Sequence, residues 1–279
     1  MIIQELKSQG NTIIANIYPT QSQPEYAVIM NSATGAKQSY FRYFAAYLAE
    51  KGILVITYDY SGIGQSAPES LVGYQTDLVQ WGKDDMDAVV NFVVENYTYK
   101  KLVFVNQSVG GQIAPLCPSI HRIDGMINVA CSLPYWKLWP FPQRFVVLFN
   151  SLVMFPITAL FGYFPGKKMG IMENLPKEVG RQWMRWVQQP HYLFDSVEGA
   201  TEKFASLTFP LISYSFDDDT TSPKNTIEAL NVYYRNCELT YKHIYPDDIG
   251  VKSLGHFGFF REKCRVLWDD LIEEMRMKI

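Results

Sequence analysis

The segment KLVFVNQSVGGQ, residues 101–112, places an apolar run directly before a serine and two glycines. The run Lys101–Val105 is typical of a strand that is covered on both faces of a sheet. The following residues, Gly111–Pro118, are compatible with a short helix. Ser108 therefore falls on a tight turn between a strand and a helix, where a nucleophile is exposed at a sheet edge. A serine that only caps the helix fits the same letters.

The residues around Ser108 test the first interpretation. A nucleophile on such a turn has a strained backbone, so the residues two positions before and after it must be small. Gly110 meets this requirement and Asn106 does not. Because asparagine tolerates a positive φ better than most residues do, we expect the turn to form.

The rest of the chain alternates between apolar strands and amphipathic helices. A hairpin is expected to turn at Gly10-Asn11. Further strands are predicted at 27–30, 53–58, 101–105, 125–131, 209–216 and 239–244. Helices are predicted at 39–51, 75–96, 222–235 and 259–277. Strand–helix units of about thirty residues predict an α/β fold with a mostly parallel sheet wrapped by helices. The core domain comprises residues 1–131 and 196–279, and the Trp-, Pro-, Phe- and Leu-rich segment 132–195 is an insertion.

Composition narrows the class of protein. The chain has 279 residues, 48 % of them hydrophobic, and a net charge of −3 without clustered basic residues, which argues against nucleic acid as a partner. Four cysteines without a CxxC pair and a start unlike a signal peptide predict a cytoplasmic protein. No metal-ligand spacing or phosphate-binding glycine motif is present, so no cofactor is expected.

A nucleophilic serine needs a histidine base. Four histidines are available, and His256 differs from the others because it lies in LGHFGFF, a glycine-flanked loop between the last predicted strand and the last helix. An imidazole there can reach over the sheet edge, although a surface histidine fits equally well. We interpret His121, His191 and His243 as surface or structural residues.

The base needs an acid that accepts its Nδ1 proton and fixes its tautomer. Asp217, Asp218 and Asp219 follow the predicted strand 211–216, and each of the three carboxylates is a candidate. A solvated turn is the alternative interpretation. The order serine, acid, histidine, with the serine and the acid each directly after a strand, nevertheless indicates an enzyme.

An acyl-transfer site also needs an oxyanion hole made of backbone N–H groups. The residue after the nucleophile, Val109, is one candidate donor. The loop MNSATG supplies the second, with Thr34 as first choice and Ala33 as second. A simple glycine-containing connection is the alternative for this loop.

Several motifs together resemble the α/β-hydrolase superfamily, and within it a bacterial branch near the serine aminopeptidases and monoacylglycerol lipases. They are ATG at 33–35, YFRYFAAYLAEKG at 40–52, YDYSGIGQS at 58–66, QSVGGQ at 107–112, YWKLWP and FGYFPGKKMG in the insertion, SFDDD at 215–219 and GHFGFFR at 255–261. Asn106 and Ser61 depart from the usual pattern, which has a glycine and an arginine there. The resemblance covers nearly the whole chain.

The resemblance implies a Ser108–Asp219–His256 triad, with Asp219 singled out because it stands four residues before Pro223. It implies hydrolysis of a carboxylic ester through an acyl-enzyme, with a small hydrophobic molecule as substrate. Hydrolysis of an amide or peptide is the competing activity. A non-catalytic protein that binds a hydrophobic ligand is the alternative from a different class.

An insertion at this place in the superfamily forms a helical cap over the site. Phe141, Phe145, Leu148, Phe149 and Leu152 fall at helical spacings and predict a cap helix that faces an apolar pocket, with Trp136, Phe145 and Phe149 as pocket residues. A cap core without ligand contact is the alternative interpretation.

The run 145–164 approaches the length of a membrane span. Asn150, Ser151 and Pro156 interrupt it, so we expect no transmembrane helix. The sequence is compatible with shallow docking on a membrane surface, with Trp136, Lys137 and Trp139 as candidate interfacial residues. The sequence does not determine an oligomeric state.

Overall fold

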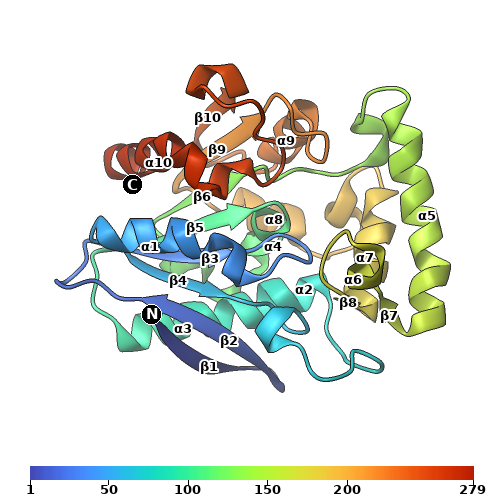
Figure 1. Ribbon diagram of the computed structural model, residues 1–279, viewed down its shortest axis with the longest axis horizontal. Coiled ribbons are helices and arrows are strands. Elements are labelled where there is room, and N and C mark those ends of the chain that lie inside the picture. The colour runs from blue at the N-terminus through green and yellow to red at the C-terminus, as the bar shows by residue number, and fades with distance from the viewer.

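An eight-stranded sheet forms the centre of the molecule (Figure 1). The computed structural model describes residues 1–279. Across the sheet the strands are β1 (Ile2–Ser8), β2 (Asn11–Tyr18), β4 (Leu54–Tyr58), β3 (Tyr26–Asn31), β5 (Lys101–Gln107), β6 (Gly125–Val129), β9 (Pro210–Phe216) and β10 (Glu238–Ile244). The strands from β4 to β10 run parallel, whereas β2 is antiparallel to both of its neighbours. The predicted mostly parallel α/β fold is confirmed.

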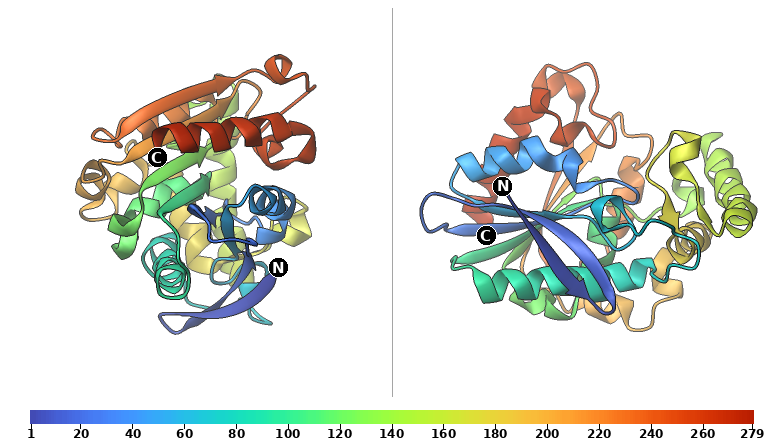
Figure 2. Two further views of the ribbon diagram at one scale, coloured as in Figure 1. Left: turned by 90° about the vertical axis from the view of Figure 1, so that its left-hand side faces the viewer. Right: turned by 60° about the horizontal axis from the view of Figure 1, so that its bottom comes forward.

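The central strands are apolar throughout because helices cover both faces of the sheet. In β3, Ala27 and Ile29 point to one core and Val28 and Met30 to the other. Helices α1 (Arg42–Glu50) and α10 (Arg265–Lys278) cover the second face. The first face is covered by α3 (Met86–Asn96), α8 (Ala200–Ala205) and α9 (Lys224–Asn231), and Figure 2 shows the three layers.

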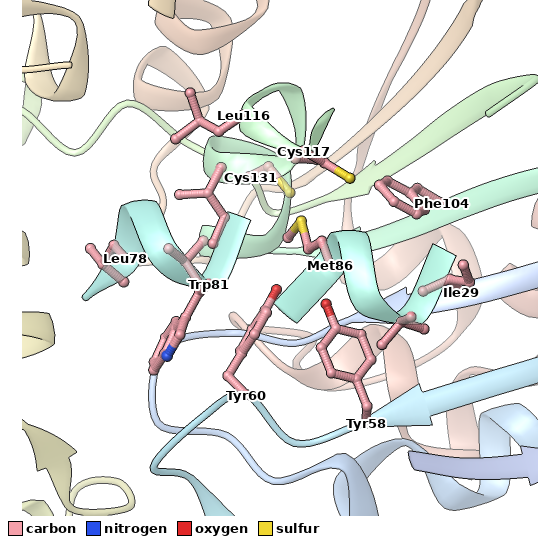
Figure 3. Packing of buried hydrophobic residues seen from close by; sticks show 14 of the residues in the cluster. Ile29, Tyr58, Tyr60, Leu78, Trp81, Met86, Phe104, Leu116, Cys117 and Cys131 are labelled. Carbon is pink, nitrogen blue, oxygen red and sulfur yellow. The ribbon is translucent and has the colours of Figure 1, made fainter. Parts of the chain in front are cut away.

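Aromatic packing joins the strand β4 to the helix that follows it. The ring of Tyr60 stacks on Trp81 with a centroid distance of 4.6 Å, and Tyr58 lies edge-on to Tyr60 (Figure 3). The Trp81 indole also donates a hydrogen bond to the Ser61 carbonyl at 3.0 Å. These contacts hold the turn YSGIGQS against the helical segment that contains Trp81.

Some predicted helices have different ends in the structure. The helix expected from residue 75 begins at α2 (Leu78–Gln80), because the Asp77 carboxylate accepts a hydrogen bond from the Gln80 N–H at 2.8 Å. It passes through a π-helical turn, Trp81–Asp85, into α3. The last helix begins at Arg265 after two 3₁₀ turns, rather than at Phe259.

Between β6 and β9 the chain leaves the sheet. This part contains α5 (Gln143–Phe161), β7 (Tyr163–Phe164), α6 (Gly166–Met169), β8 (Leu175–Pro176) and α7 (Lys177–Val187), and β7 pairs with β8 in antiparallel fashion. Helix α5 lies at the rim of the molecule, away from the sheet (Figure 1). A window of 18 residues within it has a mean hydropathy of 1.8, so by length and composition alone α5 is apolar enough to cross a membrane.

Candidate active site

Ser108 lies on a sharp turn between β5 and α4 (Val109–Ile113), with φ +53° and ψ −114°. A residue other than glycine rarely adopts such a backbone conformation, which has an energetic cost. The glycines that follow allow α4 to pack closely. A Cβ on Gly110 would lie 2.6 Å from the Asn31 carbonyl oxygen, and one on Gly111 would lie 2.6 Å from Cys131 Sγ.

Asn106 belongs to a row of buried polar side chains across the sheet. Its Oδ1 accepts a hydrogen bond from Asn31 Nδ2 at 2.7 Å, and its Nδ2 donates to Asn128 Oδ1 at 2.8 Å. The row continues to Tyr58, whose hydroxyl donates to Asn31 Oδ1 at 2.6 Å. The expected turn forms, but it does not need a positive φ at Asn106: this residue lies within β5, and the positive φ belongs to Ser108.

The structure brings Asp219 and His256 together. Asp219 Oδ2 lies 2.8 Å from His256 Nδ1, and the side chain of Asp219 is fully buried. The other oxygen, Oδ1, accepts hydrogen bonds from the N–H groups of Thr221 at 2.8 Å and Ser222 at 2.9 Å. These bonds fix the carboxylate so that one oxygen faces the imidazole. The arrangement can hold the histidine in the tautomer that leaves Nε2 free to accept a proton.

The two neighbouring carboxylates have different partners. Asp218 accepts hydrogen bonds from Ser253 Oγ and from the N–H groups of Leu254 and Gly255, all between 2.8 and 2.9 Å. Partial burial acts to raise the pKa of Asp218, but these hydrogen bonds outweigh it and hold the pKa below its ordinary value. Asp217 Oδ1 lies 3.5 Å from His243 Nε2. Asp218 thus anchors the loop that carries His256, whereas Asp217 lies against β10.

Two further hydrogen bonds hold the His256 loop against the core. Gln107, directly before Ser108, donates from Nε2 to the His256 carbonyl at 2.8 Å. The Tyr40 hydroxyl donates to the Phe257 carbonyl at 3.0 Å. Two adjacent residues of the loop are therefore tied to β5, which leads into Ser108, and to the 3₁₀ turn Gln38–Phe41.

Ser108 and His256 line the same cavity, which has a volume of about 320 Å³. Its wall has apolar side chains, hydroxyls and amides but no Asp, Glu, Lys or Arg; among the residues that form it are Thr34, Gln112, Trp139, Asn150, Met154, Trp183 and Ser222. His256 is the only histidine in this wall. His121, His191 and His243 contact Pro118, Tyr233 and Ser215 instead.

Of the oxyanion candidates, Ala33 and Thr34 both line the cavity beside Ser108. Their backbone N–H groups have no hydrogen-bond acceptor within the chain. Val109 is the first residue of α4, and the first N–H groups of a helix have no partner inside it. These N–H groups are thus available to a ligand oxygen.

The prediction that Phe145 and Phe149 line the pocket is wrong. They are 52 % and 64 % exposed and lie on the opposite face of α5. The face toward the cavity carries Val147, Asn150, Ser151 and Met154. Trp136 does not line the cavity either, and its ring packs beside Phe145. The physical reason is that large apolar side chains usually face a core, whereas α5 has its most apolar side in contact with solvent.

Comparison with known proteins agrees with the fold. Residues 22–159 match the family of serine aminopeptidases, S33. Among solved structures, DcsB in complex with its substrate analogue is similar, with a TM-score of 0.67 and 14 % identity over 100 % of this chain and 99 % of that one. The chain has the α/β-hydrolase fold. No curated protein sequence matches this chain.

Two esterases have the same fold. Est1E from Butyrivibrio proteoclasticus, with ferulic acid bound, superimposes on this chain with a TM-score of 0.66 and 14 % identity, covering 99 % of this chain and 98 % of that one. The esterase EaEST from Exiguobacterium antarcticum gives a TM-score of 0.65 and 15 % identity, covering 99 % of this chain and 100 % of that one. At this identity the likeness extends to the fold alone.

Several residues of the candidate site are not indicated by the sequence. Asn150 and Ser151 interrupt an apolar run in the sequence, yet both face the cavity. Their polarity was the signal that could have oriented the helix. Trp139, expected at a membrane interface, is buried, and its indole donates to the Thr220 carbonyl at 3.0 Å. Gln112 Oε1 accepts a hydrogen bond from the Tyr192 hydroxyl at 2.7 Å, a contact that no sequence pattern indicates.

Proposed function

We propose that this protein is a serine hydrolase that cleaves carboxylic esters of uncharged substrates. One observation carries the proposal. Asp219 holds the Nδ1 side of His256 at 2.8 Å, and His256 shares a cavity with Ser108, which lies on a strained turn. A base, an orienting acid and a nucleophile in one pocket are the parts that covalent acyl transfer requires.

In the proposed reaction His256 Nε2 takes the proton of the Ser108 hydroxyl as Oγ attacks the ester carbonyl. Asp219 stabilises the imidazolium that forms. The N–H groups of Val109 and Thr34 stabilise the negative charge on the carbonyl oxygen of the tetrahedral intermediate. His256 then gives its proton to the leaving alcohol, and an acyl-enzyme on Ser108 remains. In the second half of the reaction, His256 takes a proton from a water molecule as the water attacks the acyl carbonyl. His256 then returns the proton to Ser108 Oγ, and the carboxylic acid is released.

The cavity wall supports an uncharged substrate. A charged group would lose its hydration without gaining an ion-pair partner, because no Asp, Glu, Lys or Arg side chain lines the cavity. Met154, Trp183 and Val187 offer apolar surface for an acyl or alcohol chain. We infer that residues 132–195 form the cap that selects the substrate, with Asn150 and Ser151 of α5 as its polar contacts.

A peptide or amide is the second candidate substrate, because the matched family is described as serine aminopeptidases. An aminopeptidase must hold the free ammonium group of its substrate. The absence of a carboxylate from the cavity wall therefore favours the ester.

Hydrolysis of a matched ester and amide pair tests this choice. We expect p-nitrophenyl butyrate to be hydrolysed and alanine p-nitroanilide to be untouched, and we expect Ser108→Ala to abolish the ester activity. Equal or better turnover of the anilide would reverse the assignment. No turnover of any graded p-nitrophenyl ester would favour a non-catalytic protein that binds a hydrophobic ligand.

We also infer a cytoplasmic location, which the cysteines support. All four are unpaired, and Cys117, Cys131 and Cys264 are buried. Burial raises the pKa of the Cys117 and Cys131 thiols to about 12, so both are unreactive at neutral pH.

A further inference from the structure

Helix α5 presents an uncovered apolar face to solvent. We define this face by six side chains, each between 50 % and 81 % exposed: Phe141, which precedes the helix, and Phe145, Val146, Phe149, Leu152 and Leu160. Figures 1 and 2 show α5 at the rim of the molecule with no other element on its outer side. Contiguous exposed apolar surface of this kind marks an interaction site.

The segment that carries this face has charges of only one sign. From Gly125 to Met172 the chain has four basic residues, Lys137, Arg144, Lys167 and Lys168, and no Asp or Glu. Because the whole chain carries −3, the remaining residues carry a net charge of −7. The segment with the apolar face is thus net positive in a chain that is net negative.

The basic residues lie at both ends of the face. Lys137 precedes α5, with its Nζ 5.4 Å from the centre of the Trp136 ring, and Lys168 follows α5, with its Nζ 5.2 Å from the centre of the Phe161 ring. Neither of these lysines has a carboxylate partner, whereas Lys167 pairs with Glu173 at 2.7 Å. A helix of 19 residues is about 28 Å long. The surface is therefore a long apolar strip with unpaired cations at each end.

We propose that this strip docks the protein on the surface of an anionic lipid bilayer, with α5 parallel to the membrane plane. Aromatic and aliphatic side chains enter the boundary between headgroups and acyl chains, and Lys137, Arg144 and Lys168 contact lipid phosphates. This proposal does not depend on the proposed activity, because docking is measured by binding alone.

Two alternatives fit the strip less well. A second copy paired through α5 about a two-fold axis would bring the lysines of one helix end against those of the other end, with no acidic residue in the segment to neutralise them. A transmembrane orientation would remove the inner face of α5, with the buried Ser151, Met154 and Thr158, from the protein. Surface docking leaves this inner face in place.

Co-sedimentation of the full-length protein with vesicles tests the proposal. Two compositions are compared, pure phosphatidylcholine and a 7:3 mixture of phosphatidylcholine and phosphatidylglycerol. We expect the protein to bind the anionic vesicles, and we expect binding to fall as NaCl is raised from 0.1 to 0.5 M. Phe145→Ser combined with Phe149→Ser should weaken this binding at least about tenfold. Lys137→Gln combined with Lys168→Gln should weaken it about twentyfold.

Control variants remove exposed apolar or cationic side chains elsewhere on the surface. Val232→Ser with Val266→Ser removes two exposed apolar side chains, and Lys83→Gln with Lys278→Gln removes two exposed unpaired charges. Both controls should bind like the unaltered protein. Because all substituted side chains are exposed, the variants should keep the unaltered melting temperature.

Three results would overturn the proposal. They are no sedimentation with either vesicle, an equal loss of binding in the control variants, or a dimer that Phe145→Ser with Phe149→Ser dissociates. The last result, measured by light scattering without lipid, would assign the strip to a second copy of the chain.

Discussion

The carboxylate of Asp219 lies 2.8 Å from Nδ1 of His256, although the two residues come from loops after different strands of the sheet. Its neighbours in the Asp217–Asp219 run do not compete for this position. The Asp218 carboxylate accepts hydrogen bonds from backbone N–H groups of the His256 loop, and Asp217 lies near His243. Three consecutive carboxylates therefore have three different structural roles.

This arrangement predicts that the three aspartates differ in their effect on turnover. Asp219→Asn should lower kcat by about three to four orders of magnitude, because an amide in that place no longer favours the required tautomer of His256. Asp217→Asn should leave kcat within about a factor of two. Steady-state kinetics with p-nitrophenyl butyrate measures both, and equal losses in the two variants would show that the acid is assigned wrongly.

Asp218 is expected to act as a positioning residue. In Asp218→Asn, an N–H₂ group replaces either Oδ1, which accepts from Gly255, or Oδ2, which accepts from Ser253 and Leu254, and it cannot accept those hydrogen bonds. The loop should loosen and kcat should fall about ten- to a hundredfold, with KM little changed. Measurement of kcat and KM separately, with the melting temperature as a control for unfolding, tests this. A variant with unaltered kcat would disprove the role.

The Asn106 row predicts a loss of stability when the superfamily's glycine is restored. Asn106→Gly leaves Asn31 Nδ2 and Asn128 Oδ1 buried without their present partners, at a cost of about 3 kcal/mol in the free energy of unfolding. Asn106→Ala serves as the matched variant, because it removes the amide without adding glycine's flexibility. Urea denaturation should give similar losses for both, and an unchanged Asn106→Ala would contradict the account.

The sequence predicted the architecture because its signals are local and repeated. The strands β3, β5 and β9 read as apolar runs since both of their faces are buried, and the turns after β5 and β9 contain Ser108 and the aspartates. Which of the three aspartates contacts His256 depends on the course of the loop that carries His256, far away in the chain. No local sequence pattern predicts that course. In the sequence, Asp219 is distinguished only by its position four residues before Pro223.

Other features depend on long-range contacts that a single sequence does not express. The role of Asn106 follows from partners on two neighbouring strands, Asn31 and Asn128, which are far away in the chain. The sequence predicts the outer face of α5 to be the inner one, because large apolar residues usually face a core. Asn150 and Ser151 lie toward the cavity instead, because this helix has its most apolar side in contact with solvent.

Asp85 predicts a pH dependence of stability. Burial raises its pKa from 3.8 to about 6, although Ser8 Oγ and the N–H and Oγ of Ser61 donate hydrogen bonds to it. The folded protein therefore binds this proton more tightly than the unfolded chain does. The resulting stabilisation is complete below pH 3.8 and is lost as the pH rises through about 6, with a total of about 3 kcal/mol.

Urea denaturation between pH 4.5 and 7.5 measures this contribution by comparison with Asp85→Asn. The amide cannot ionise, and the Ser8 and Ser61 hydroxyls can accept from it where they now donate. The stability of the variant should therefore decline less than that of the unaltered protein over this range. Parallel curves for the two proteins would show that Asp85 does not titrate there.

Labelling with a fluorophosphonate tests the assignment of Ser108 as an activated nucleophile most directly. The reagent phosphonylates a serine only when a base takes up the hydroxyl proton during attack. Mass spectrometry should locate one adduct on the peptide that contains Ser108, with no adduct in Ser108→Ala and strongly slowed labelling in His256→Gln. A protein that stays unlabelled, or that labels at the same rate without His256, would contradict the account.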